Sequence, residues 1–142
     1  MALKTDRKGN PALGRVLVVE DDPVLALTLE DALLTGGAKA VVICPTMEST
    51  MAELEKAPAD AVVIDVHLAD RDDGWALAEL VEMLGTRLPR IVFSTGAPQD
   101  IPAQVAEMGP IFEKPYDPAE LVAALSDGEK RGLFAKLRGT IG

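Results

Sequence analysis

The chain has 142 residues, of which 48% are apolar and 26% charged, the make-up of one ordinary globular domain. Its formal charge of −9 disfavours contact with phosphate backbones, so we expect no nucleic-acid partner. Because it has one cysteine (Cys44), no apolar run of roughly 20 residues and no signal-peptide core, we expect a cytoplasmic protein without a disulfide or a membrane span.

Five short apolar runs predict the strands of one sheet. Each run holds about four consecutive residues of high β propensity without polar alternation. Such runs are typical of strands in a parallel sheet that is covered on both faces. The runs lie at 16–19, 40–43, 61–64, 90–93 and 110–112.

Helical segments separate these runs. Asp21 or Asp22 can cap the first helix, whose apolar stripe is Leu25, Leu29, Ala32 and Leu33, and Gly36-Gly37 ends it. The second begins at Thr46 and the third contains Trp75. The fourth, around 101–108, is short because of its prolines, and the fifth opens at Asp117-Pro118.

The alternation of strand and helix predicts an α/β fold. We expect a flavodoxin-like, doubly wound sheet of five parallel strands with five flanking helices over residues 14–125. Residues 1–13 are expected to be a flexible leader. Residues 126–142 form a C-terminal extension in which Leu133, Phe134 and Leu137 have helical spacing among basic residues. This extension is interpreted as a short helix on the domain, or as a segment that docks on a partner or touches a membrane.

Acidic residues follow two of the predicted strands. Glu20 and Asp21 come directly after the first, and Asp65 after the third. Ligands bind beyond the carboxyl ends of parallel strands, so the three side chains converge if these strands are neighbours. Three carboxylates repel one another unless a cation neutralises them, and their oxygens favour Mg²⁺ or Mn²⁺.

Hydroxyls and a lysine follow two further strands. Ser94-Thr95 ends the fourth and Lys114 follows the fifth. An acidic cluster, a hydroxyl and a lysine together suit a phosphoryl group, with one carboxylate as the nucleophile. Each residue alone has an ordinary explanation, such as a helix cap for Asp22 or a surface position for Lys114. Their coincidence at four of five strand ends favours a site.

These motifs, in this order, resemble the receiver domains of response regulators in two-component signalling. The resemblance covers roughly residues 14–125. It rests on the segments 16–23 (VLVVEDDP), 62–68 (VVIDVHL) with Asp73-Gly74, 93–96 (FSTG) and 112–116 (FEKPY).

The resemblance implies a role for each residue of the site. Asp65 would accept a phosphoryl group from a histidine kinase, and Lys114 would bridge to the Asp65 carboxylate and then to the phosphoryl group. The Lys114–Pro115 peptide would be cis. The implied Mg²⁺ ligands are Asp65, Asp21, Glu20 through water, and the backbone carbonyl of His67, whose side chain is interpreted as lying at the rim.

The sequence departs from the usual receiver pattern in three places. The switch hydroxyl is Ser94 by its distance from Pro89, or Thr95 by similarity to the Phe-Ala-Thr-Gly motif of an atypical alphaproteobacterial subclass; we prefer Thr95. Ile111 stands three residues before Lys114, where an aromatic is usual, and this also matches that subclass. By analogy the partner would be a kinase of the HWE type. The loop between Asp65 and Gly74 is one residue longer than usual.

We therefore expect a stand-alone response regulator that is a phosphoacceptor rather than an enzyme, and a monomer. Because 17 residues follow Leu125, its output would be binding of a downstream protein or draining of phosphate from a kinase. One alternative is a phosphorylation-independent pseudo-receiver. Another is an Asp-nucleophile phosphohydrolase, which is disfavoured because His67 stands where such enzymes place an aspartate as general acid.

Overall fold

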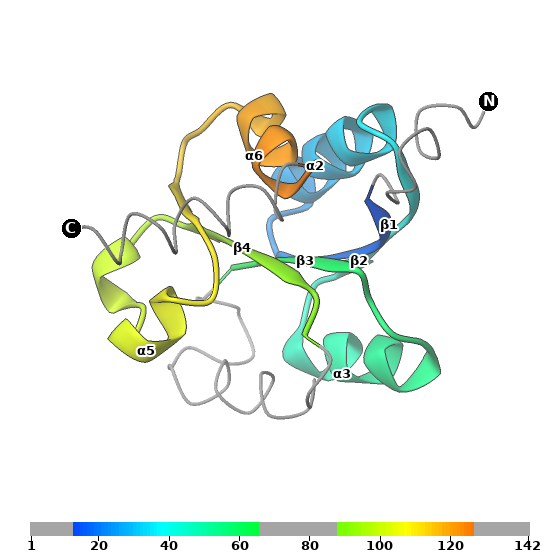
Figure 1. The fold of residues 1–142 in the computed structure, drawn as a ribbon, viewed down its shortest axis with the longest axis horizontal. Helices are drawn as coiled ribbons and strands as arrows, with labels where there is room; N and C mark the ends of the chain where they lie inside the picture. The colour runs from blue at the N-terminus through cyan, green and yellow to red at the C-terminus, as the bar shows by residue number, and fades with distance from the viewer. Residues whose placement is uncertain (1–12, 66–87, 127–142) are drawn as a thin grey trace, which may run out of the picture.

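A computed structural model of the chain describes residues 13–65 and 88–126 (Figure 1). Five strands in these ranges form one sheet in the order β2-β1-β3-β4-β5, and every neighbouring pair is parallel. The doubly wound α/β fold is therefore confirmed. The strands are β1 (Gly14–Val19), β2 (Ala38–Cys44), β3 (Ala61–Ile64), β4 (Arg90–Thr95) and β5 (Ile111–Glu113).

Helices cover both faces of this sheet. Figure 1 shows α2 and α6 on one face and α3 and α5 on the other. The expected third helix, with Trp75, lies outside the described residues. Within the described ranges no helix is both long enough and apolar enough to cross a membrane. The elements are α2 (Pro23–Thr35), α3 (Met47–Lys56), the 3₁₀ turn η1 (Pro98–Asp100), α5 (Ala103–Ala106) and α6 (Pro118–Ser126).

Polar side chains cap the start of α2 and of α3. The Oδ1 atom of Asp22, not Asp21, accepts hydrogen bonds from the amides of Val24 and Leu25 at 3.0 and 3.4 Å. Thr46 and Ser49 form a reciprocal capping box at the start of α3. These caps bind amide groups that have no partner inside the helix.

Two hydrophobic clusters hold the sheet between its helices. Alternate residues of β1 point to opposite faces, so Val16 and Val18 pack on the side of α2 and α6, while Leu17 and Val19 pack on the side of α3 and α5. The structure thus explains why the strands read as continuous apolar runs.

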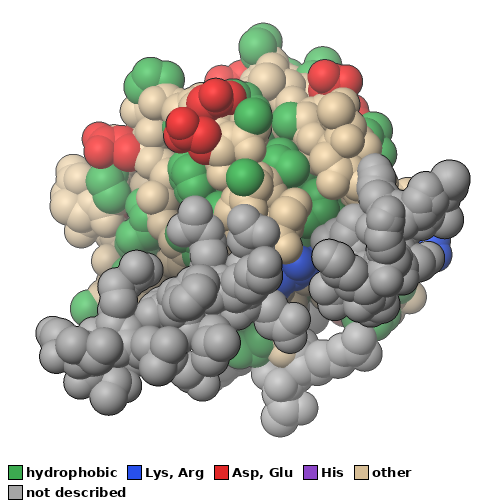
Figure 2. All heavy atoms as spheres, turned by 45° about the horizontal axis from the view of Figure 1, so that its top comes forward, with side chains coloured by type: hydrophobic (Ala, Val, Ile, Leu, Met, Phe, Trp, Pro, Cys, Tyr) green, Lys and Arg blue, Asp and Glu red, His purple; other side chains and the backbone are tan. Residues whose placement is uncertain are grey.

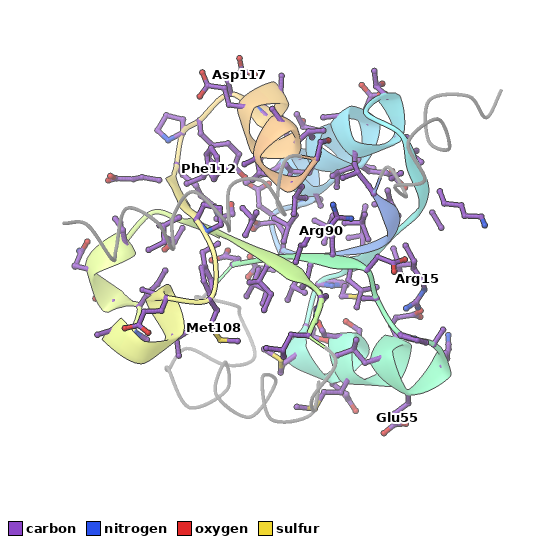
Figure 3. All side chains as sticks on the ribbon, viewed as in Figure 1. Arg15, Glu55, Arg90, Met108, Phe112 and Asp117 are labelled. Atoms are coloured by element: carbon purple, nitrogen blue, oxygen red, sulfur yellow. The ribbon has the colours of Figure 1, made fainter. Side chains whose placement is uncertain are left out.

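Two arginines donate hydrogen bonds to carbonyl groups at the C-terminal ends of α3 and α6 (Figure 3). The Arg15 guanidinium donates to the carbonyls of Ala57 at 2.8 Å and Glu53 at 3.2 Å, at the end of α3. The Arg90 guanidinium donates to the carbonyl of Leu125 at 2.9 Å, in the last turn of α6. Each arginine lies at the amino end of its strand, Arg15 in β1 and Arg90 in β4, so it ties a helix end to the end of the sheet opposite the acidic residues.

The surface over α2 and α6 mixes apolar and acidic side chains (Figure 2). The most exposed large apolar side chains of α2 are Val24 and Leu27, at 73% and 59%. Leu13, the last residue of the expected leader, is fully buried in the cluster between the sheet and these two helices.

Candidate functional site

The acidic residues lie together at the carboxyl ends of β1 and β3. These strands are neighbours in register, with Val19 opposite Ile64, so the residues that follow them reach the same level. The Asp65 amide still donates to the Val19 carbonyl at 2.9 Å. One carboxylate oxygen from each of Glu20, Asp21 and Asp65 lies within 4.8 Å of the others.

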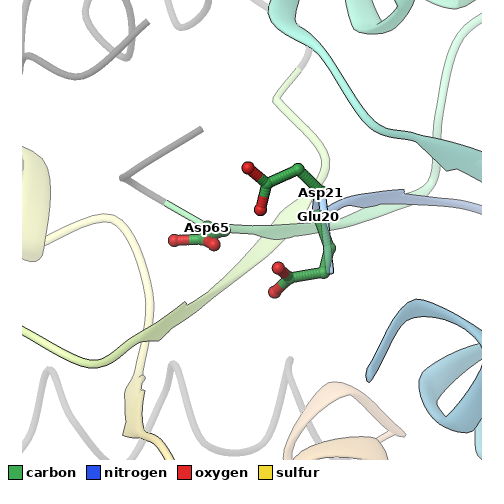
Figure 4. Close-up of side chains that lie close together, drawn as sticks. All are labelled: Glu20, Asp21 and Asp65. Carbon is green, nitrogen blue, oxygen red and sulfur yellow. The ribbon is translucent and has the colours of Figure 1, made fainter. Parts of the chain in front are cut away.

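The three carboxylates differ in their surroundings (Figure 4). The Glu20 and Asp21 side chains leave the end of β1 in opposite directions, and Asp65, which directly follows β3, lies beside them. Glu20 and Asp65 are 2% and 5% exposed, whereas Asp21 is exposed. One side of the cluster is therefore protein and the other is open to water.

Lys114 brings an ammonium group to the buried side of this cluster. Its Nζ lies 3.0 Å from Glu20 Oε1 and 3.1 Å from Asp65 Oδ2. Its amide donates to the carbonyl of Thr95 at 2.8 Å, and the Lys114–Pro115 peptide is cis. The structure thus brings together Glu20, Asp21, Asp65 and Lys114 from three separate strand ends.

The electrostatics of the cluster favour an added cation. Burial raises the pKa of Glu20 to about 7, although the Asp22 amide and Lys114 act in the opposite direction. Burial acts to lower the pKa of Lys114, but its hydrogen bonds to Glu20 and Asp65 outweigh this and raise it. The Lys114 ammonium group contacts Glu20 and Asp65, two of the three carboxyl groups in the cluster. Oxygen donors of this kind, open to water on one side, fit a divalent cation such as Mg²⁺ that retains coordinated water.

The two candidate hydroxyls at the end of β4 have different partners. Thr95 is fully buried, and its Oγ1 accepts a hydrogen bond from the Ala97 amide at 2.9 Å. Ser94 is 1% exposed, and its Oγ lies 2.7 Å from the hydroxyl oxygen of Tyr116. Because side chains alternate along a strand, the two hydroxyls project from opposite faces of the sheet.

Tyr116 is a neighbour of the site that sequence reasoning did not single out. Burial raises the pKa of its hydroxyl, and the charges of Glu20 and Asp65 act in the same direction. The signal was present in the segment FEKPY, which places a tyrosine two residues after Lys114. Ile111 lies on the edge strand and is 37% exposed. His67 and the loop to Gly74 lie outside the described residues.

Comparisons with known proteins agree with this geometry. Residues 16–126 match the response regulator receiver domain family. No curated protein sequence was found to match the chain. A receiver domain (CheY-like) from Methylobacillus flagellatus has a similar structure, with 28% identity and a TM-score of 0.64, over 77% of this chain and 92% of that one.

Two further structures share the fold at lower identity. The response regulator PhyR from Brucella abortus is 24% identical with a TM-score of 0.65, over 89% of this chain and 50% of that one, so this chain spans about half its length. The REC domain of PhyR from Erythrobacter litoralis is 22% identical with a TM-score of 0.68, over 84% and 89% of the two chains. Taken with the acidic cluster and Lys114 at the strand ends, the family match shows that this chain belongs to the response regulator receiver domain family.

Proposed function

We propose that this chain accepts a phosphoryl group on Asp65 from the phosphohistidine of a histidine kinase, in a reaction that requires Mg²⁺ or Mn²⁺. The observation that carries the proposal is the Asp65 carboxylate, buried beside the Lys114 ammonium group at 3.1 Å and within 4.8 Å of two further acidic residues. Such a carboxylate is held in place and faces a site suited to anionic oxygens.

The chemistry is a displacement at phosphorus. A carboxylate oxygen of Asp65 forms a bond to phosphorus as the phosphorus–nitrogen bond of the phosphohistidine breaks, and the leaving imidazole takes its proton from water. Asp21, Asp65, Glu20 and the carbonyl of His67 would hold the metal ion. The ion would neutralise charge on the phosphoryl oxygens. Lys114 remains protonated because its pKa is raised, so it can move its contact from Asp65 to the phosphoryl group.

Thr95 is our candidate for the hydroxyl that binds the phosphoryl group, with Ser94 as the alternative. The Oγ1 atom of Thr95 accepts a bond from the Ala97 amide, which leaves its own proton available to a phosphoryl oxygen. Ser94 is instead paired with Tyr116.

The wider assignment follows the resemblance. We propose a cytoplasmic, monomeric phosphoacceptor of the Phe-Ala-Thr-Gly subclass that is served by a kinase of the HWE type. Its output would be binding of a downstream protein or use as a phosphate sink. A long-lived phosphoryl group would favour the first and rapid hydrolysis the second.

The test is a time course of intact mass with acetyl phosphate and Mg²⁺. Wild type should gain one phosphoryl group, Asp65→Asn none, and Asp22→Asn, which removes a neighbouring charge but keeps a capping side chain, should behave as wild type. Equal labelling in excess chelator would overturn the metal requirement. A chain that takes phosphate neither from acetyl phosphate nor from a phosphorylated kinase would be a pseudo-receiver. Turnover of a phosphomonoester beyond one equivalent would indicate a phosphohydrolase.

A further inference from the structure

The loop that carries Lys114 is attached to β4 at two points. On one side of the Lys114 side chain, its own amide donates to the Thr95 carbonyl at 2.8 Å. On the other side, the Tyr116 hydroxyl lies 2.7 Å from Ser94 Oγ. Residues 114–117 connect β5 to α6, so both attachments act on the same short segment.

The second attachment is well enclosed. Ser94 is buried, and the Tyr116 ring packs edge-on against Phe112, with ring centroids 5.8 Å apart. Both rings contact the cluster between the sheet and α2 and α6. A rigid ring with two rotatable bonds therefore fixes the position of its hydroxyl, and the bond to Ser94 fixes the loop in turn.

Lys114 needs such an anchor more than the carboxylates do. Glu20 and Asp65 directly follow strands in the middle of the sheet, whereas Lys114 follows a three-residue strand at its edge. Its flexible side chain, 27% exposed, must also reach Glu20 and Asp65 at the same time. A small displacement of the loop would break the contact at 3.1 Å with Asp65.

We propose that Tyr116 and Ser94 are positioning residues that hold the Lys114 ammonium group against Asp65. The two hydroxyls of β4 then have separate tasks: Ser94 positions Lys114 through Tyr116, and Thr95 is left for the phosphoryl group. This inference rests on the proposed function for its rate measurements, but not for its spectroscopic ones.

The rate measurements use single and double variants. Tyr116→Phe and Ser94→Ala each remove the hydrogen bond, so the maximal rate of labelling by acetyl phosphate should fall about two- to twelvefold, the net worth of one such bond. Ser94→Thr keeps a hydroxyl and should recover much of the rate. In a Lys114→Met background, Tyr116→Phe should cause no further loss, because the residue acts through Lys114.

A matched control separates positioning from general loss of stability. Thr50 is buried on α3, and its Oγ1 donates to the Thr46 carbonyl at 2.8 Å. Thr50→Val removes a buried hydroxyl of the same kind, and it should lower the free energy of unfolding while leaving the labelling rate within about twofold of wild type. If Tyr116→Phe and Ser94→Ala stay within twofold of wild type, or slow labelling no more than Thr50→Val, the proposal is wrong.

The spectroscopic measurement uses the sole tyrosine of the sequence. Tyrosine labelled with ¹³C at Cζ gives one signal from Tyr116, and Mg²⁺ alone should shift it in wild type, through Lys114, much more than in Ser94→Ala or Lys114→Met. A Mg²⁺ shift of equal size in all three proteins would overturn the positioning role. If wild type takes no phosphoryl group, the proposed function fails, and this measurement still decides the inference.

Discussion

Lys114 Nζ lies 3.0 Å from Glu20 Oε1, so an ammonium group from the end of β5 neutralises a carboxyl group buried at the end of β1. Between them in the sheet lie β3 and β4. The ion pair therefore links the edge strand β5 to β1 in the middle of the sheet, and it lies next to Asp65 at the end of β3.

Removing the cation should destabilise the protein in a metal-dependent way. Lys114→Met leaves Glu20 and Asp65 buried without their ammonium partner, so without Mg²⁺ the free energy of unfolding should fall by roughly 1–3 kcal/mol. Saturating Mg²⁺ should reduce the difference in the free energy of unfolding between the variant and wild type, because the ion supplies the missing positive charge. Urea unfolding at pH 8, with and without Mg²⁺, measures both effects.

Lys56→Met is the matched control for that variant. Lys56 Nζ lies 2.9 Å from Glu53 Oε2 in an exposed pair on α3. Exposed pairs contribute little, so this variant should unfold as wild type at either Mg²⁺ concentration. Equal losses in the two variants would mean that the buried pair has no special role.

Neighbouring aspartates should separate metal binding from helix capping. Asp21→Asn removes the negative charge of an exposed carboxylate that we propose as a metal ligand, so the affinity for Mg²⁺ should fall about tenfold or more with little change in stability. Asp22→Ala removes the cap of α2, so the free energy of unfolding should fall by about 1 kcal/mol while the Mg²⁺ affinity is kept. Isothermal titration calorimetry measures the Mg²⁺ affinity of each variant, and urea unfolding measures its free energy of unfolding. Unchanged Mg²⁺ affinity in Asp21→Asn would refute its assignment as a ligand.

Cys44 should be unreactive in the folded protein. Burial raises the pKa of its thiol to about 11 from an ordinary 9.0. At pH 8 the sulfur is therefore inaccessible to reagents, and the thiol is not ionised to the reactive thiolate. Iodoacetamide should label the native chain far more slowly than the urea-unfolded chain. Because the folded pKa is the higher one, stability is lost as the pH rises from about 9 to 11, and Cys44→Val should flatten that part of the pH profile. Fast labelling of the native chain would contradict this.

Arg90 should matter for stability and not for the site. Arg90→Gln removes the hydrogen bond to the Leu125 carbonyl, and the free energy of unfolding should fall by about 1–2 kcal/mol. Lys39→Gln, on the exposed part of β2, serves as the comparison and should unfold as wild type. The Mg²⁺ affinity should be the same in both variants. A loss of Mg²⁺ affinity in Arg90→Gln would show that the two ends of the sheet are coupled.

The convergence of the carboxylates could be predicted because it depends on strand order alone. Because β1 and β3 are parallel neighbours, Glu20 and Asp65, which directly follow them, lie side by side at the carboxyl ends of the two strands. The end of β4 was less predictable. Ser94 and Thr95 are polar, so the apolar pattern stopped at Phe93, yet the ladder with β5 continues to Thr95 opposite Glu113. Backbone pairing does not require apolar side chains.

Contacts that depend on the rotation of a helix about its axis, or on the path of a loop, could not be predicted from the sequence. In α2 the fully buried residues are Ala26, Leu29 and Leu33, while the predicted Leu25 and Ala32 are only partly buried. The helix is rotated slightly from its expected face because it packs against α6 as well as the sheet. The pairing of Ser94 with Tyr116 likewise requires the register of β4 and β5 and the path of the loop between Lys114 and Asp117.

The backbone beneath the acidic cluster is continuous with the sheet. The amides of Glu20, Asp65 and Lys114 donate to the carbonyls of Cys44, Val19 and Thr95 on the adjoining strands. Hydrogen exchange at these three amides then requires the adjoining strand ends to separate, so it should be slower than at amides that are exposed to solvent. The backbone at Asp65 is therefore held by the sheet when a charge is added to or removed from its side chain. We expect the structural response to such a change in the surrounding side chains and loops.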